Sequence, residues 1–477
     1  MTAMVIEVPE ELKQVGDAFV ALIEDASRRL RAAAGGRAVD YGAVEVDVAG
    51  KVAAIERAVH ERVLGALDVD QPRVRIGGRE HVRVGRHEAT YHTLAGDVVV
   101  LRSLYRAAGE RNGRTVDPVS LRAGVVADGW LPQTAQAMAH QVQRGPSREA
   151  QEAARELCRL PYSRCSFERV AHAVGELYVA QKEDVEQALI ESYEVPAEAV
   201  SASVSLDRVA MPMEEPRPRP IGRPRKGAAR RPIDRVFRMA YVGTVTLHDA
   251  EGNALHTIRY GRMPQGYAVG LCEAMGSDVE ALLKEKPGLR IIALSDGAEE
   301  IVSLLREHIC EAELGVPVDQ LIDFWHLIEK LGAAATVIYG SRATDVLARW
   351  KLRVLNSGRA LAEIRTELEA SGRRQARRRV DGRMSRPVHE AITYLHNHEG
   401  LMGYAAARRA GLPIGSGSVE ATCKSLVGVR MKRSGARWKE ESGNHVLQLR
   451  ALALSDRWSE GIHLTLRPLR KPVRVVA

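Results

Sequence analysis

Residues 288–296 read GLRIIALSD, and this stretch decides the fold class. Its continuous Ile-Ile-Ala-Leu run is typical of a strand that is buried on both faces of a sheet. Gly297 and an expected helix start at Ala298 follow directly, which is the strand-to-helix order of an α/β layer. The sequence therefore predicts a buried strand that ends in an acid, Asp296, just before a helix.

Two further strand signals lie upstream of this run. VSASVSLD (200–207) reads as a short strand, and VFRMAYVGTVTLHDAEGNALHTIRYG (236–261) reads as a hairpin that turns at Asp249–Asn253. A helix is expected from 270 to 286. This order of strand, hairpin, helix, strand and helix indicates an α/β fold, or α+β over the whole chain, built on a mixed sheet.

Outside this sheet the chain changes character several times. Helical spacing opens the chain, alternation with period two begins near Arg73, and helical spacing returns near Pro118. In the latter region two helices joined by a short turn resemble a helix–turn–helix, with Ser147 and Ser163 as N-caps and Ser166 as an alternative to Ser163. Both DNA contact and plain packing stay open for this pair. The expected regions are, in chain order, a helical region (1–70), a small β-hairpin region (71–110), a helical region (111–199), the first part of the sheet domain (200–331), a helical insertion (332–410), the second part of the sheet domain (411–455) and a basic C-terminal tail (456–477).

Composition excludes several classes of protein. The chain has 477 residues, of which 45% are hydrophobic, and no apolar run approaches the roughly 18 residues that a membrane-spanning helix needs. Its first residues lack the basic and apolar regions of a secretory signal. The 5 cysteines are scattered without a Cys-x-x-Cys pair, which fits a reducing cytoplasm and predicts no cysteine zinc site. We therefore expect a cytoplasmic protein with no membrane partner.

The positive charge is unevenly placed along the chain. Lys and Arg number 69 against 61 Asp and Glu, which gives a net charge of +8. Two blocks, PRPRPIGRPRKGAARR (216–231) and RRQARRRVDGRMSR (373–386), are strongly basic. Like-charge blocks repel themselves and are solvated or meet a polyanion. Nucleic acid is therefore the expected partner, and association with the nucleoid the expected location.

Three acids stand where metal chemistry could use them. Asp207 closes the first strand, Asp296 ends the central strand, and Glu420 lies in the expected first turn of a helix. Each also has an ordinary explanation, namely an exposed strand end, a helix N-cap, and a partner for the helix dipole or for Lys424. Acids at strand ends of one sheet, with another acid on a helix packed across it, can converge on one point. Two divalent cations about 3.5–4 Å apart need such shared carboxylates, and Mg²⁺ prefers oxygen ligands.

Three stretches resemble the bacterial insertion-sequence DDE transposases of the ISKra type. They are LSDGAEEI (294–301), IDFWHLIEKL (322–331) and, most specifically, IGSGSVEATCKSLVGVRMKRSGARW (414–438). The resemblance covers the chain from about residue 70 to residue 455. It implies an RNase H-like catalytic domain that is interrupted by a helical insertion at 332–410.

By this resemblance Asp207, Asp296 and Glu420 form the catalytic triad and hold two Mg²⁺ ions, for which Mn²⁺ can substitute. The implied protein is a transposase that cleaves the terminal inverted repeats of an insertion element and joins the 3′-hydroxyl to target DNA. It acts as a homo-oligomer on DNA because two ends must be held together. Two other functions stay open: a non-catalytic DNA-binding protein derived from a transposase, and an RNase H-like nuclease without strand transfer.

Further positions follow or depart from the family pattern. Asp323 and His326 form an Asp-x-x-His element that lies near the catalytic pocket in related transposases; the alternative is a helix start with core packing. Arg208 stands where relatives usually have glycine after the first aspartate, so Asp234 and Asp249 are alternatives for that acid. Many relatives also carry a cysteine zinc ribbon in the N-terminal β region, which here keeps its hairpins without cysteines.

Basic residues are expected around the proposed site. IGRPRKG (221–227) resembles an AT-hook, and its alternative is a basic loop that holds phosphates. Trp438 is expected either to stack on an unpaired base or to belong to a core. The expected DNA-binding residues are Arg217, Arg219, Arg223, Arg225 and Lys226 in the loop, and Lys424, Arg430, Lys432, Arg433, Arg437 and Trp438 near Glu420.

Overall fold

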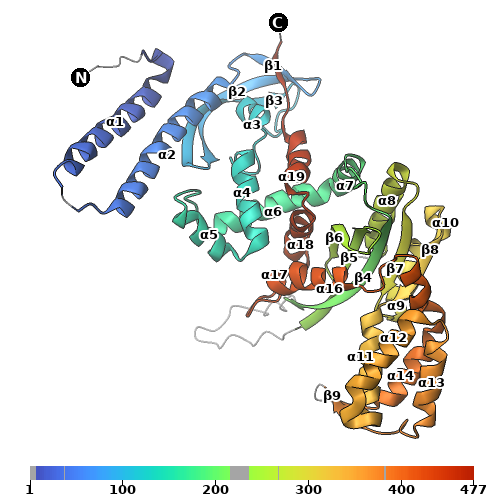
Figure 1. Ribbon diagram of the computed structural model, residues 1–477. Helices are drawn as coiled ribbons and strands as arrows, with labels where there is room; N and C mark the ends of the chain where they lie inside the picture. The colour runs from blue at the N-terminus through green and yellow to red at the C-terminus, as the bar shows by residue number, and fades with distance from the viewer. Residues whose placement is uncertain (1–6, 37, 215–235, 267, 381–382, 477) are drawn as a thin grey trace, which may run out of the picture. The chain divides into compact units, whose positions relative to one another are not determined.

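The computed structural model describes residues 7–36, 38–214, 236–266, 268–380 and 383–476 (Figure 1). The chain forms two compact units, one built from Met1–Val185 with Trp458–Ala477 and the other from Glu186–Arg457. In the described ranges no helix combines the length and the apolar character needed to cross a membrane.

The first unit begins with two antiparallel helices, as the helical spacing predicts. After a short 3₁₀ turn, η1 (Glu10–Leu12), α1 (Lys13–Ala33) runs out and α2 (Tyr41–Ala66) returns along it. An ion pair between Arg29 and Asp47 joins the two helices. Figure 1 shows this pair as two long, adjacent helices.

Alternation with period two after Arg73 produces the predicted antiparallel strands. The sheet of this unit has the order β11-β1-β2-β3, and its outermost strand comes from the end of the chain. Val473 of β11 packs with Val74 and Tyr105, so the described residues 456–476 contain a helix and an edge strand and are not a free tail. The strands are β1 (Arg73–Ile76), β2 (Arg79–Thr93), β3 (Gly96–Ala107) and β11 (Val473–Val475).

Helices complete the first unit. The predicted helix pair exists as α5 and α6, and Ser163 caps α6 by accepting a hydrogen bond from the Ser166 N–H at 3.2 Å. Ser147 is not a cap but the first residue of α5, and its hydroxyl donates to Glu168. The helices are α3 (Pro118–Ala123), α4 (Pro132–Arg144), α5 (Ser147–Glu156), α6 (Arg164–Ala180) and α19 (Trp458–Leu466), with α7 (Lys182–Glu191) at the boundary between the units.

The second unit is built on a mixed five-stranded sheet of order β6-β5-β4-β7-β8, so the predicted α/β class is confirmed. β6, β5 and β4 are antiparallel neighbours, whereas β7 and β8 run parallel to β4. β4 extends to Met213, beyond the predicted end at Asp207. Beyond Ser205, β4 pairs within the sheet with β5 but no longer with β7. Proline has no backbone N–H to donate, and Pro212 is tolerated because β4 is an edge strand at that position. The strands are β4 (Ser201–Met213), β5 (Val236–His248), β6 (Ala254–Arg262), β7 (Arg290–Ser295) and β8 (Val318–Ile322).

The two faces of this sheet differ in polarity. On one face Ala202, Val204 and Leu206 of β4 join an aliphatic core with α8 (Ala268–Glu285) and α9 (Glu299–His308); the short α10 (Glu311–Leu314) follows α9. On the other face β4 presents serines and then Asp207. That face is covered by α16 (Gly417–Thr422), a π-helical segment (Cys423–Gly428), α17 (Val429–Met431) and α18 (Glu440–Leu454).

A largely helical segment separates β8 from α16, and it begins with α11 at Phe324, before the start at 332 that was expected for an insertion. Its helices share one hydrophobic core with β7. In this core Trp350, Ile364 and Leu395 are buried together with Leu294 of β7. The Arg-rich block contains a hairpin that we did not predict, although its sequence holds the Asp-Gly dipeptide that favours hairpin turns. The elements are α11 (Phe324–Tyr339), η2 (Gly340–Arg342), α12 (Ala343–Asn356), α13 (Ala360–Ala370), β9 (Arg378–Val380), β10 (Arg383–Ser385), α14 (Pro387–Asn397), η3 (Glu399–Leu401) and α15 (Tyr404–Arg409).

Candidate active site

Three neighbouring strands of the second unit lead to aspartates at the same edge of the sheet. Asp207 on β4 and Asp296 after β7 each lie two residues beyond the last paired residues of these parallel strands. Asp296 and Asp323 each follow directly after the last pair of β7 and β8, and the Asp323 N–H donates to the Ser295 carbonyl at 2.7 Å. Because adjacent strands lie about 4.8 Å apart, the three carboxyl groups share this edge.

Glu420 approaches this edge from the helix that covers it. It lies in the first turn of α16, as predicted, and α16 packs against β4 and β5. The Cys423 thiol, further along the same helical segment, donates to Asp207 Oδ2 at 3.5 Å. Burial, together with the charges of Asp207 and Glu420, raises the pKa of Cys423, so this cysteine remains a thiol. The helix thus brings Glu420 to the edge where Asp323 lies, with ligand atoms of the two residues within 4.8 Å of one another.

Asp323 links the start of the insertion to the start of the Glu420 helix. Its Oδ1 accepts the N–H groups of Trp325 at 2.7 Å and His326 at 2.9 Å, which caps α11. Its Oδ2 accepts the hydroxyl of Ser416 at 2.8 Å and also the Ser416 N–H. Burial alone would raise the pKa of Asp323, but the hydrogen bonds from His326 and Ser416 outweigh it and hold the pKa at about 2. Asp323 therefore stays ionised and fixes the N-terminus of α16.

His326 stands between the acids as a cation. Its Nδ1 lies 3.4 Å from Asp323 Oδ1 and 3.8 Å from Glu420 Oε1. Hydrogen bonding to Asp323 raises the pKa of His326 to about 9; burial opposes this shift, and the charges of Asp323, Asp296 and Glu420 add to it. While no cation is bound, the ring is therefore favoured as an imidazolium at neutral pH.

The acids differ in how far their oxygens are already used. In the described part of the chain, the ligand atoms of Asp323, His326 and Glu420 lie within 4.8 Å of one another. An ionised carboxylate has about four acceptor sites, and all four of Asp323 are taken. Asp207 and Asp296, in contrast, keep spare acceptor capacity, since Asp296 accepts only the Ala298 N–H, at 2.8 Å, among the described donors. Among the described residues, the ligand atoms that lie close enough together to share a cation are thus those of Asp323, His326 and Glu420, while Asp207 and Asp296 keep unused acceptor sites at the same edge.

A side chain of α14 and the side chain of the residue that follows this helix hold the backbone after β7. The Tyr394 hydroxyl donates to the Asp296 carbonyl at 2.9 Å, and His398 Nε2 lies 2.9 Å from the Gly297 carbonyl. Gly297 has φ +89, in the left-handed region that favours glycine. A Cβ on Gly415 would lie 3.1 Å from the Trp325 ring, so glycine there permits a close approach. The insertion therefore supports the loop that carries Asp296.

The strand alternation explains how arginine can follow the first aspartate. Asp207 and Arg208 leave β4 on opposite faces, and Arg208 forms an ion pair with Glu300 of α9. The alternative acid Asp249 lies at the far end of β5, next to the residue that pairs with Ser201, and binds the backbone of its own turn. Asp234 lies outside the described residues.

The expected DNA-binding residues separate into two groups. Lys424, Lys432 and Arg437 are exposed, and Arg433 is half-buried. Arg430 is only 6% exposed, with its guanidinium 5.0 Å from the centre of the Trp438 ring. The Trp438 indole donates to the Met431 carbonyl at 2.9 Å, and its backbone pairs with Pro212 and Glu214. These contacts bury Arg430, which was expected to contact DNA, and favour the packing alternative for Trp438. Arg217, Arg219, Arg223, Arg225 and Lys226 lie outside the described residues.

Sequence reasoning missed an exposed aromatic ring at this edge. Trp325 is 55% exposed, and Lys351 Nζ lies 4.9 Å from the centre of its ring. Trp325 follows Asp323 by two residues at the start of α11. A tryptophan at a helix N-terminus, directly after a capping acid, is a signal that could have pointed to it.

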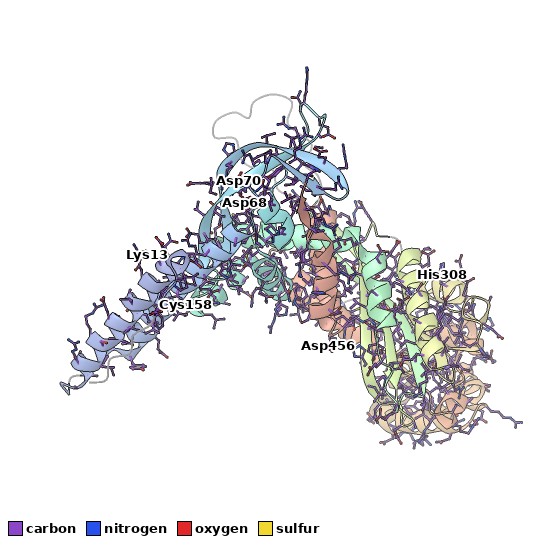
Figure 2. The ribbon with its side chains drawn as sticks, turned by 90° about the horizontal axis from the view of Figure 1, so that it is seen from above. Lys13, Asp68, Asp70, Cys158, His308 and Asp456 are labelled. Carbon is purple, nitrogen blue, oxygen red and sulfur yellow. The ribbon has the colours of Figure 1, made fainter. Side chains whose placement is uncertain are left out.

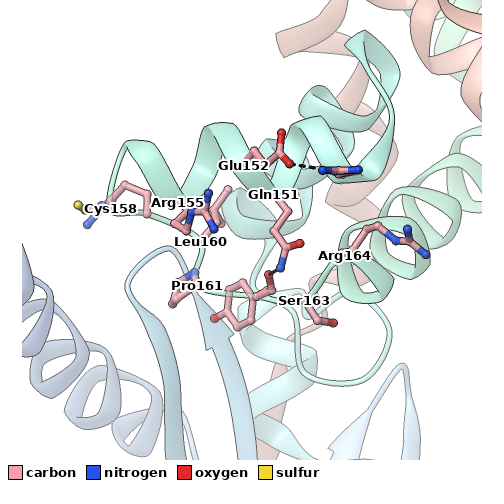
Figure 3. Close-up of a pocket in the computed structure, with 11 residues that line it drawn as sticks. Gln151, Glu152, Arg155, Cys158, Leu160, Pro161, Ser163 and Arg164 are labelled. Carbon is pink, nitrogen blue, oxygen red and sulfur yellow. Dashed lines mark hydrogen bonds and ion pairs between the residues drawn. The ribbon is translucent and has the colours of Figure 1, made fainter. Parts of the chain in front are cut away.

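A separate cavity of about 870 Å³ lies in the first unit, beside α5 and the turn that joins α5 to α6 (Figure 3). Arg148, Arg155, Arg159 and Arg164 line it. Arg159 is bound to Glu56 at 2.6 Å, and Arg148 to Glu152 at 3.0 Å. The other two arginines also face carboxylates, since Arg155 lies 3.7 Å from Glu156 and Arg164 lies 3.8 Å from Glu168. The choice between DNA contact and packing for this helix pair stays open.

Comparison with known proteins gives little further information. No family model and no curated protein matches the chain. Among solved structures, it is similar to a chain of the Drosophila P element transposase strand transfer complex at 11% sequence identity and a TM-score of 0.23. That match covers 68% of this chain and 79% of the other. Similarity at this level supports no conclusion about function.

Proposed function

We propose that this protein is a DNA transposase of the DDE type with an RNase H-like catalytic domain. The observation that supports the proposal is that Asp207 and Asp296 lie at the same edge of two adjacent parallel strands, while Glu420 lies in the first turn of α16, which packs against β4. The mixed sheet and the helical insertion between its second aspartate and its glutamate agree with the family that the sequence resembles.

The proposed chemistry is phosphodiester hydrolysis followed by strand transfer. Asp207, Asp296 and Glu420 would hold two Mg²⁺ ions, for which Mn²⁺ can substitute. Such ions, when bound, polarise the phosphate and activate the attacking water or 3′-hydroxyl. Asp323 would fix the position of Glu420 through Ser416, and the Cys423 thiol would orient Asp207.

The protein's cations would place the DNA at this edge. The imidazolium of His326 faces the acids and would also attract a phosphate oxygen. Exposed Lys424, Lys432 and Arg437 would contact the backbone, and the exposed ring of Trp325 would stack on an unpaired base. The expected partners are terminal inverted repeats and target DNA, held by a homo-oligomer associated with the nucleoid.

The proposal is tested with purified protein on DNA that carries the terminal inverted repeats of its element. We expect Mg²⁺-dependent cleavage and joining that Asp296→Asn and Glu420→Gln each abolish. Asp249→Asn is the matched control, since it changes a turn acid far from the site and should leave both activities intact. Binding without cleavage would favour a non-catalytic DNA-binding protein, and cleavage without joining a nuclease. Full activity in the Asp296 and Glu420 variants would refute the proposed mechanism.

A further inference from the structure

The helical run that carries Glu420 contains one turn that is wider than an α-helical turn. α16, the π-helical segment and α17 follow one another without a break over residues 417–431. Within this run the Val429 N–H donates to the Lys424 carbonyl, five residues earlier. An α-helix would pair this N–H with the Ser425 carbonyl, four residues earlier. The π turn therefore leaves the Ser425 carbonyl without its usual donor in the helix.

A buried arginine from another helix donates to this carbonyl. Arg450 lies in the last turns of α18, which ends two residues before Asp456 (Figure 2). Arg450 is only 7% exposed, and its Nε and Nη2 lie 2.8 Å and 2.6 Å from the Ser425 oxygen. A guanidinium is always charged in proteins, and it is rarely buried unless its N–H groups have acceptors. Arg450 thus supplies the donors that the π turn requires, and the freed carbonyl helps to satisfy a buried cation.

Burial along this run has a period of four residues. Every fourth residue of one row is buried, namely Val419, Cys423, Val427 and Met431. Four residues of an α-helix turn by about 400°, so a regular helix would place Met431 about 120° around the axis from Val419. The π turn reduces this drift because its hydrogen bond spans one more residue. It thereby keeps both Cys423, which donates to Asp207, and Met431 on the face that covers the sheet.

The adjacent row of the same run is more exposed and has the same period. It consists of Glu420, Lys424, Gly428 and Lys432, of which the two lysines are exposed. In a regular α-helix Lys432 would also lie about 120° around the axis from Glu420. The π turn reduces this angle and so brings both ammonium groups toward the side of the helix that carries the Glu420 carboxylate.

We infer that Arg450 is a positioning residue, which holds the π turn and so aligns Lys424 and Lys432 with Glu420 for contact with the phosphates next to the cleaved one. At about 1.5 Å per residue the row from Glu420 to Lys432 spans at most about 18 Å, which corresponds to about five base pairs of DNA. The inference rests on the proposed function, because it assigns these contacts to DNA bound at the candidate active site.

The test is a double-mutant cycle on the affinity for a DNA duplex that carries a terminal inverted repeat. Fluorescence anisotropy without Mg²⁺ measures this affinity at several salt concentrations, so that cleavage does not contribute. Lys432→Gln should make the slope of log K against log salt concentration shallower by about 0.9, because one phosphate contact is lost. Arg450→Met removes the donors to Ser425, so Val429 returns to this carbonyl and Lys432 turns away from the DNA. We expect the same change in slope, and no further change when Lys432→Gln is added.

Two further variants complete the cycle. Arg450→Lys keeps a charged donor and should retain both the original slope and the full effect of Lys432→Gln. Arg259→Met is the matched control, because Arg259 also donates to backbone carbonyls of this unit, but outside the Glu420 run. Additive effects of Arg450→Met and Lys432→Gln would overturn the inference and leave the proposed function intact. A protein that does not bind this DNA would overturn both.

An engineered metal site tests the π turn even if Arg450→Met does not fold. Lys424→His combined with Val429→His changes two exposed positions. An α-helix places residues five apart at about 140° around its axis, where two imidazoles could not share an ion, whereas the π turn places them one turn apart. We expect Ni²⁺ to bind this double variant at least about 10-fold more tightly than either single variant, as measured by isothermal titration calorimetry. Equal affinities in the three variants would overturn the inference.

Discussion

Two aspartates of the second unit are almost fully buried, yet their carboxyl groups behave in opposite ways. Asp323 at the sheet edge is 0% exposed and Asp278 in α8 is 4% exposed. Burial favours the neutral form of both. It raises the pKa of Asp278 to about 6, whereas at Asp323 hydrogen bonds outweigh burial and hold the pKa at about 2. Low exposure to solvent therefore does not by itself decide whether a carboxyl group is protonated.

The difference comes from the donors that face each carboxylate. Asp323 accepts four hydrogen bonds, three of them from backbone N–H groups that the ends of α11 and α16 hold in place. Asp278 accepts the Tyr260 hydroxyl at 2.5 Å and Arg457 Nη1 at 3.3 Å. Backbone donors are fixed by the fold and stabilise the charged form. The fold thus keeps charge at the proposed site and tolerates its loss within the core.

The largest expected effect is on catalysis. In Asp323→Asn, either the amide NH₂ or the weaker acceptor oxygen of asparagine would face Ser416. A buried donor of this pair then lacks a good acceptor, and the N-terminus of α16 is held less firmly. We expect Mg²⁺-dependent cleavage to slow roughly 100-fold or more, because a shift of about 1 Å in Glu420 has that cost. Asp278→Asn, the matched buried change, should leave the cleavage rate close to that of the unaltered protein. Equal losses in both variants would mean that the two sites do not differ in role.

The next effect is on how stability depends on pH. A raised pKa means that the folded state binds the proton of Asp278 more tightly than the unfolded chain does, so its contribution is fully present below about pH 4 and is lost by about pH 6. We expect the free energy of unfolding, from urea titrations, to fall by on the order of 3 kcal/mol over this range. Asp278→Asn should remove that slope. A slope that persists in this variant would assign it to other groups.

The same contrast should extend to two tryptophans. Trp325 at the sheet edge is exposed, whereas the indole and backbone of Trp438 are engaged in packing. Trp325→Ala should weaken binding of a DNA end with a short single-stranded overhang by about 1–3 kcal/mol, as measured by fluorescence anisotropy. Trp438→Phe should leave this affinity unchanged even if it lowers the melting temperature. The reverse result would restore Trp438 as the stacking residue.

The sequence was sufficient for the sheet and for the acids on it, for physical reasons. A run of apolar residues that ends in an acid predicts a buried strand with a polar end, and parallel strands bring such ends to one edge, as at Asp207 and Asp296. The end of β4 was predicted too early, because Arg208 and Pro212 do not read as strand residues. Both are tolerated there, since Arg208 pairs with Glu300 and Pro212 lies beyond the reach of β7.

Contacts between distant segments could not be predicted from the sequence. Asp323 and Ser416 are far apart along the chain, so the hydrogen bonds that set the charge of Asp323 depend on how the insertion closes. Arg430 was expected to be exposed because it lies in a basic stretch, but its aliphatic stem and planar head pack on Trp438. The sequence is sufficient to predict that Arg430 is charged, but the tertiary contacts determine whether its side chain faces solvent.

The smallest expected effect isolates the part that His326 plays in keeping Asp323 charged. His326→Gln removes the cation next to this carboxylate and leaves the backbone donors in place, so the pKa of Asp323 should rise from about 2 toward its usual value. The lowered pKa of Asp323 stabilises the folded state at pH values above the pKa of the unfolded chain, and this contribution is lost as the pH falls. In the variant the loss should begin at a higher pH, so that the free energy of unfolding near pH 4 is lower by about 1 kcal/mol. Urea titrations between pH 2 and 5 measure this, with His463→Gln on the exposed side of α19 as the control. If His326→Gln and His463→Gln lose stability at the same pH, His326 does not contribute and the backbone N–H donors alone keep Asp323 ionised. The contrast with Asp278 would then come from its having side-chain donors in place of backbone N–H groups.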